Sequence, residues 1–112
     1  MEVLEMISFQ DWQKAELKVA KILAAEDIPG KDKLYKIKID LGSEQRQIVA
    51  GIRAFYTKEE LEGKNLIVVA NLEPAKIAGI ESQAMLLAAK DSEGKYKLVT
   101  IDGSVEPGTK VE

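Results

Sequence analysis

The strict alternation of apolar and polar residues over residues 35–41 is the feature that most constrains the fold. The four apolar side chains fall on one side of an extended chain, and two lysines and an aspartate fall on the other. This period of two predicts a β-strand with one buried face and one face in water. Gly42 and Ser43 favour a turn, so residues 45–52 are expected to form the second strand of a hairpin.

Two helices and further strands are expected on either side of this hairpin. Ser8 and Thr57 are each followed three residues later by an acidic residue, a spacing typical of helix N-caps, so a short helix is predicted after each. The apolar residues of 15–27 change phase near Ala20 and Lys21, which predicts a strand bent by a bulge. The remaining strands are expected over residues 66–70, 85–89 and 96–101.

The order of these elements predicts an all-β fold with short helices. Five strands with a short helix between the third and the fourth is the order of an OB-fold, a small barrel that commonly binds oligonucleotides. A bent first strand favours this fold, because a long strand must curl to help close a small barrel. The 112 residues are expected to form one domain, residues 1–112, with a barrel core over about residues 8–89 and a C-terminal extension over residues 90–112.

Composition argues against several classes of function. The chain has no cysteine and no histidine, so it lacks a thiol nucleophile, a thiolate metal ligand and the commonest general base. Its sequence has no catalytic or phosphate-loop motif, and we expect no enzymatic activity, no cofactor and no metal. No apolar run approaches the roughly 20 residues of a membrane span, and the first residues carry acids, so a cytoplasmic protein is expected.

Charge is unevenly distributed along the chain. The net charge of −3 argues, by itself, against a nucleic-acid partner. Residues 14–53, however, hold nine bases and six acids, which gives this section a local charge of +3. Such a section can contact phosphate, although the molecule as a whole does not attract polyanions over long distances. Any affinity for nucleic acid is therefore expected to be moderate and strongly dependent on salt.

Three segments of the sequence together resemble a known family. They are residues 71–89, which contain Asn71-Leu-Glu-Pro and Ser82-Gln-Ala-Met85, and the shorter runs 46–52 and 29–34. Over roughly Ile7 to Val111 the chain resembles the stand-alone tRNA-binding proteins and the domain that ends many methionyl-tRNA synthetases. The resemblance implies a non-catalytic OB-fold that binds the outer corner of the L-shaped tRNA, and a homodimer formed through the C-terminal extension. It fits a free-standing protein and a detached synthetase accessory subunit equally well.

Three cations in the first half of the chain are candidate tRNA-binding residues, and the resemblance favours two of them, Lys31 and Lys33. Lys31 and Lys33 lie in a predicted loop, where long cations can reach a phosphate; the residues alone are also compatible with ordinary solvated charge. Arg46 begins the third predicted strand, and its planar guanidinium can hold two phosphate oxygens. An ion pair of Arg46 with Glu44 or Asp40 is an equally good interpretation. Lys36 and Lys38 are weaker candidates, because they simply face outward from a strand.

Four further tRNA-binding residues are implied for the second half. Asn71 and Ser82 can contact a base edge or a 2′-hydroxyl, and their alternatives are a turn-stabilising and a loop-capping role. Lys76 can pair with phosphate. Met85 can lie against a base or sugar, although core filling is the commoner role of methionine. With the resemblance, we expect Met85 to lie at the binding cleft.

The chain departs from the usual pattern of the family at three positions. Glu73 stands where a lysine is frequent, and Ala75 and Ala78 stand at positions that are often basic. Less positive charge there is expected to weaken contact with phosphate.

A second hypothesis is a peptide-binding export chaperone that shares this fold and uses an apolar groove. That family lacks the loop from Lys31 to Lys33 and much of the extension, whereas this chain has both. The first hypothesis is therefore favoured.

Overall fold

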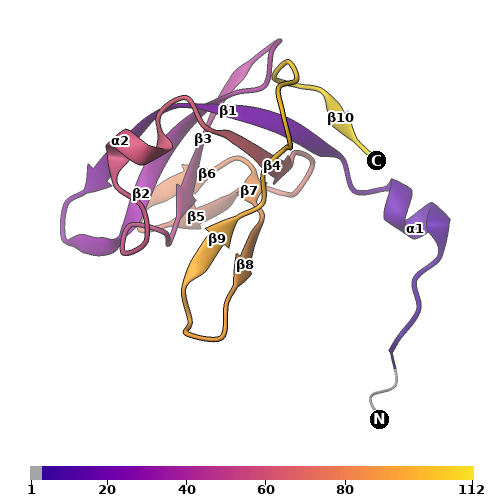
Figure 1. Cartoon of the computed structure of the whole chain (residues 1–112), viewed down its shortest axis with the longest axis horizontal. Coiled ribbons are helices and arrows are strands. Elements are labelled where there is room, and N and C mark those ends of the chain that lie inside the picture. The colour runs from indigo at the N-terminus through magenta and orange to yellow at the C-terminus, as the bar shows by residue number, and fades with distance from the viewer. Residues whose placement is uncertain (1–3) are drawn as a thin grey trace.

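Strands predominate in the computed structural model, which describes residues 4–112, and its two helices are short (Figure 1). The helices are α1 (Phe9–Gln13) and α2 (Lys58–Leu61). The strands are β1 (Leu17–Ile28), β2 (Lys31–Asp40), β3 (Gln45–Ala50), β4 (Asn65–Val69), β5 (Ala75–Ile77), β6 (Ile80–Ser82), β7 (Met85–Leu86), β8 (Ala88–Lys90), β9 (Tyr96–Leu98) and β10 (Lys110–Val111). The prediction of a mostly β chain is confirmed. Neither helix is long and apolar enough to cross a membrane in this described part of the chain.

The main sheet has the strand order β3-β2-β1-β4-β7, and β10 adds to β1 at its start. All of these pairs are antiparallel. Two further hairpins, β5–β6 and β8–β9, leave the sheet, and β8–β9 projects from the body of the molecule (Figure 1). Within residues 4–112 no backbone ladder joins β7 back to β3, so the closed five-stranded barrel expected from the sequence is not confirmed.

The predicted hairpin and both predicted helix caps are confirmed. In β2 the side chains of Tyr35, Ile37 and Ile39 are buried in the main core, as the alternation requires. The Thr57 hydroxyl accepts from the Glu60 N–H at 3.2 Å, and the Glu60 carboxylate accepts from the Thr57 N–H at 3.0 Å. These two bonds form a capping box at the start of α2. The bond from the Thr57 backbone N–H holds the pKa of Glu60 below its ordinary value, because it favours the charged carboxylate.

Both faces of the first half of β1 are buried, and this burial explains the change of phase in its sequence. Leu17 and Val19 pack with Ile67 in a second apolar cluster on the outer face. Ala20 and Ile22 belong to the main core on the inner face. The bulge itself lies two residues later than predicted, where the register with β2 shifts between Ile22 and Ala24. The change of phase in the sequence thus reflects two buried faces as well as a bend.

The C-terminal extension packs against its own chain. After the β8–β9 hairpin the chain returns to the edge of β4, where the Ile67 N–H donates to the Val99 carbonyl at 3.2 Å. Further on it reaches β1, where the Val19 N–H donates to the Thr109 carbonyl at 2.9 Å. The predicted strand over residues 85–89 is consequently divided into β7 and β8, because the chain turns out into the hairpin there. The extension covers the second apolar cluster.

Candidate functional site

Side-chain hydrogen bonds join β3 to the end of β6 and the residue that follows it, where the backbone ladder is missing. The Val49 N–H donates to the Ser82 hydroxyl, and the Gln47 N–H donates to the Gln83 side-chain oxygen, both at 3.0 Å. One backbone bond completes this seam, from the Gln83 N–H to the Gln47 carbonyl at 2.9 Å. The seam fixes the β5–β6 hairpin against the main sheet.

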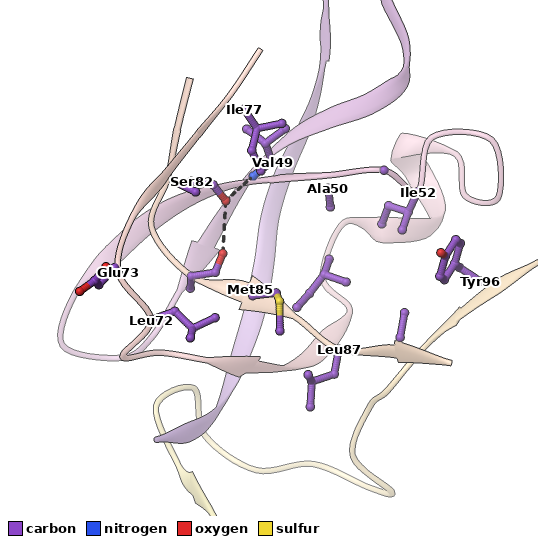
Figure 2. Close-up of a pocket in the computed structure, with 15 residues that line it drawn as sticks. Val49, Ala50, Ile52, Leu72, Glu73, Ile77, Ser82, Met85, Leu87 and Tyr96 are labelled. Atoms are coloured by element: carbon purple, nitrogen blue, oxygen red, sulfur yellow. Dashed lines mark hydrogen bonds between the residues drawn. The ribbon is translucent and has the colours of Figure 1, made fainter. Parts of the chain in front are cut away.

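The hydroxyl of Ser82 forms hydrogen bonds within this seam. Only 6% of the residue is exposed, and its hydroxyl also donates to the Ala84 carbonyl at 3.2 Å (Figure 2). A hydroxyl that accepts one backbone N–H and donates to one carbonyl has little capacity left for a ligand. Of the interpretations open for Ser82, a local structural role is the one that its contacts support.

Arg46 lies in the same region and uses its guanidinium internally. One terminal nitrogen donates to the carbonyls of Ala70 and Gln83, the latter at 3.1 Å, and Nε pairs with the Glu44 carboxylate. The ion pair considered from the sequence is therefore present. Arg46 connects the end of β4 to the seam, so it supports the surface that the neighbouring hairpin presents.

Asn71 ties the loop after β4 to the start of β1. Its side-chain oxygen accepts from the Glu16 N–H at 2.8 Å, and its side-chain nitrogen donates to the Lys14 carbonyl at 2.6 Å. These partners are more than fifty positions away in the sequence, so sequence patterns give no signal for them. These two hydrogen bonds position the loop from which β5 begins.

An open apolar cavity of about 560 Å³ lies beside this seam. The β5–β6 hairpin forms one wall with Ala75 and Ile77, and β9 contributes Tyr96 to another. Figure 2 shows Ile77 and Tyr96 on these walls. Met85 lies between them with 48% of its surface exposed, so it is a cavity residue and not core filling. Glu73 stands at the rim (Figure 2).

The predicted lysines are not gathered around this cavity. Lys31 and Lys33 are exposed at the start of β2, beside the turn that links it to β1. Lys76 alternates with the cavity residues Ala75 and Ile77 along β5, so it lies on the opposite face of that hairpin. Ser82 and Met85 share the cavity wall, whereas the predicted cations lie elsewhere on the surface.

A second hollow, of about 420 Å³, lies on the outer face of β2 and β3. It is lined by Lys36, Lys38 and Arg46 together with Glu26 and three glutamines. Lys36 pairs with Glu26 at 3.8 Å, while Lys38 makes no ion pair with any residue in the described range. The two lysines that the sequence ranked lower therefore line the most cationic concave surface near the seam. No group of three or more acidic side chains in residues 4–112 is arranged to hold a metal ion.

The three positions that depart from the usual family pattern all belong to the cavity or its hairpin. Glu73 and Ala75 line the cavity. Ala78 occupies the turn of the β5–β6 hairpin with φ of 53°, a left-handed conformation that glycine or asparagine adopts more readily. This side of the cavity is thereby apolar and acidic instead of basic.

Comparison with known proteins assigns the chain to a family. Residues 17–110 match the family described as "Putative tRNA binding domain". The chain belongs to this family. The match begins with β1 and ends in β10, so it includes the seam, both hairpins and the extension that covers β1.

Relatives of the chain are methionine–tRNA ligases, and its similar solved structures include a MetRS-related protein and a chaperone. The chain is 54% identical over 105 residues to a methionine–tRNA ligase of Thermotoga maritima, and 46% identical over 110 residues to one of Methanocaldococcus jannaschii. These two matches cover 94% and 98% of this chain but only 16% and 17% of the relatives. The structure of a MetRS-related protein of Pyrococcus horikoshii matches with a TM-score of 0.91 and 39% identity, covering 97% of this chain and all of that one. The chaperone CsaA of Bacillus anthracis matches with a TM-score of 0.87 and 27% identity, covering 96% of this chain and all of that one. The expectation that the chaperone family lacks much of the extension is therefore wrong.

Proposed function

We propose that the chain binds tRNA as a non-catalytic domain that works with methionyl-tRNA synthetase in the cytoplasm. The observation that carries this proposal is the family match, which extends over residues 17–110. The identity with methionine–tRNA ligases supports the link to that synthetase. Because the chain spans about a sixth of those relatives, catalysis is assigned to other parts of them. A second attachment point of this kind raises the affinity of a synthetase for tRNA without new chemistry.

The five-stranded barrel of an OB-fold is part of this proposal. Its strands are β1, β2, β3, β4 and the segment from β6 to β7, and side chains of the seam take the place of the missing ladder. In OB-folds the face of the second and third strands and the adjacent loops bind oligonucleotides. The polar hollow with Lys36 and Lys38 lies on this face.

Two groups of residues then have different roles in binding. Lys31, Lys33 and Lys76 are exposed and contact phosphates, and Met85 contacts a base or sugar. Arg46, Asn71 and Ser82 hold the surface in shape, because their polar atoms already bond to backbone groups within the chain. Few aromatic side chains are available for stacking, so a folded tRNA recognised by shape at its outer corner fits better than an unstructured strand.

A homodimer is the proposed assembly. Within residues 4–112 the segment around α1 buries none of its helical side chains, and Leu4 and Phe9 are 75% and 70% exposed. Val99 and Val105 in the extension are also exposed. Apolar surface at both ends of the chain favours association with a second copy.

A peptide-binding chaperone is the second candidate. The apolar cavity and the similarity to solved CsaA structures favour it. The methionine–tRNA ligases are nonetheless closer in sequence, at 54% identity against 27% for the Bacillus anthracis chaperone.

Titration with bulk tRNA at several salt concentrations tests the proposed function. If roughly three to five phosphates are neutralised, the logarithm of the binding constant should fall with the logarithm of salt with a slope of about −2 to −4. Lys33→Ala should flatten this slope by about one unit, because it removes one phosphate contact. Lys97→Ala is the matched control, since Lys97 lies on the β8–β9 hairpin and pairs with Asp91. Absence of binding at low salt would exclude tRNA as the ligand.

A further inference from the structure

The inner face of the β8–β9 hairpin supplies one wall of the apolar cavity. Ala88 and Tyr96 both line the cavity. Lys90 is paired with Tyr96 across the hairpin and lies two residues from Ala88, so all three side chains share that face. Ala89 and Lys97 are paired on the opposite face. The cavity wall therefore carries an aromatic ring, and a cation lies beside it on the same hairpin face.

The ring and the cation are held close together. Lys90 Nζ lies 5.8 Å from the centre of the Tyr96 ring, and the Phe55 ring packs edge-on against Tyr96 at 5.6 Å. Glu73 is exposed on the loop that precedes β5 and lines the same cavity. Its carboxylate makes no hydrogen bond or ion pair with any other described residue. The cavity thus offers an aromatic surface, apolar sides and the carboxylate of Glu73, and the ammonium group of Lys90 lies next to its aromatic wall.

We propose that this cavity takes a single unstacked nucleobase of the bound tRNA, an inference that rests on the proposed function. The base lies between Met85 and Tyr96, where sulfur and ring surfaces favour a flat π-system. The Glu73 carboxylate accepts hydrogen bonds from an amino group on the base edge, as carboxylates do with cytosine. Lys90 pairs with the adjoining phosphate. The site therefore favours adenine, cytosine or guanine over uracil, which has no amino group.

Charge complementarity favours a nucleotide over an apolar peptide side chain. An apolar side chain would contact the cavity walls but would use neither Glu73 nor Lys90. A nucleotide presents amino groups at one end and a phosphate at the other, which matches both charges. The volume of about 560 Å³ also lies within the usual range of small-ligand pockets, roughly 300–1,000 Å³.

Ala88→Trp and Ala89→Trp form the matched test, because the two positions face opposite sides of one hairpin. Ala88→Trp fills the cavity and should weaken binding of bulk tRNA roughly 5- to 100-fold, the range expected for loss of one stacked base, with the salt slope unchanged. Ala89→Trp should bind within about twofold of the unmodified chain. Thermal unfolding of both variants checks that each is folded.

Lys90→Ala keeps the test decisive even if Ala88→Trp unfolds the chain, since Lys90 is exposed. This change should flatten the salt slope by about one unit, whereas Lys97→Ala on the opposite face should leave it unchanged. Glu73→Gln should weaken binding of tRNA. The salt slope should not flatten, because no phosphate contact is lost.

The possible outcomes separate the cavity from the proposed function. Equal affinity of the two tryptophan variants, or of the two lysine variants, overturns the nucleobase site while tRNA binding stands. No binding of tRNA by the unmodified chain at low salt overturns the proposed function, and the nucleobase site with it. A fluorescent apolar decapeptide gives the third outcome. If Ala88→Trp abolishes its binding and tRNA does not displace it, the cavity is a peptide site and the inference is wrong.

Discussion

Replacing Gly108 by alanine should lower the free energy of unfolding by about 2–4 kcal/mol, the sum of left-handed strain and forced overlap in a packed contact. Gly108 has φ of 89°, and an added Cβ would overlap the carbonyl oxygen of Leu41. Across the same contact, a Cβ on Gly42 would lie 2.6 Å from the Pro107 carbonyl oxygen. Backbone therefore meets backbone where the extension crosses the β2–β3 turn, and neither side can move cheaply.

Gly103→Ala is the control for this substitution. Gly103 has φ of 95°, but an added Cβ would meet no atom within 4 Å. Its replacement should cost about 1–2 kcal/mol, from backbone strain alone. Urea unfolding midpoints of the two variants give the comparison. Equal losses would mean that the extension does not lock onto the β2–β3 turn, and the packing described for it would be wrong.

Replacing Ser82 by alanine should cost about 1–3 kcal/mol of stability, because it leaves the buried Val49 N–H and the Ala84 carbonyl without their partner. Met85→Ala should change stability by less than about 1 kcal/mol, since half of that side chain is already exposed. Both variants should bind tRNA more weakly. Ser82→Ala acts by loosening the seam, and Met85→Ala acts by removing a contact.

Denaturant unfolding and tRNA titration of the same two preparations separate these roles. A Ser82→Ala variant as stable as the unmodified chain would show that the hydroxyl is not needed at the seam. A Met85→Ala variant that loses stability but binds tRNA normally would place this methionine in the core after all. Either result would reverse the assignment of one residue.

Local pattern predicted the parts of the fold that depend on neighbours in the sequence. The alternation over residues 35–41 and the capping box after Thr57 both appear in the structure, since side chains two or three positions apart determine them. The seam between Gln47 and Gln83 could not be predicted in this way. Its donors and acceptors are brought together only when the whole sheet has formed, and amide side chains replace a ladder that pattern reasoning assumes to be backbone.

The sequence could name candidate site residues but not their contacts. The family resemblance selected Asn71 and Ser82, and a place on the third predicted strand selected Arg46. The structure places all three around the seam and its adjoining loop, bonded within the chain. Residue type alone does not reveal whether an amide or hydroxyl faces a ligand or its own backbone. Lys90 and Tyr96 gave no signal, because only the folded hairpin brings Tyr96 to the cavity and Lys90 beside it.

The most direct test of this account compares folded tRNA with an unstructured RNA of mixed sequence and equal length, titrated against the unmodified chain at one salt concentration. Equal length gives both ligands a similar number of phosphates, so phosphate contacts alone would bind the two alike. A surface shaped for the outer corner of tRNA should bind the folded ligand at least about tenfold more tightly, a difference of about 1.4 kcal/mol. Equal affinity for the two ligands would contradict recognition by shape.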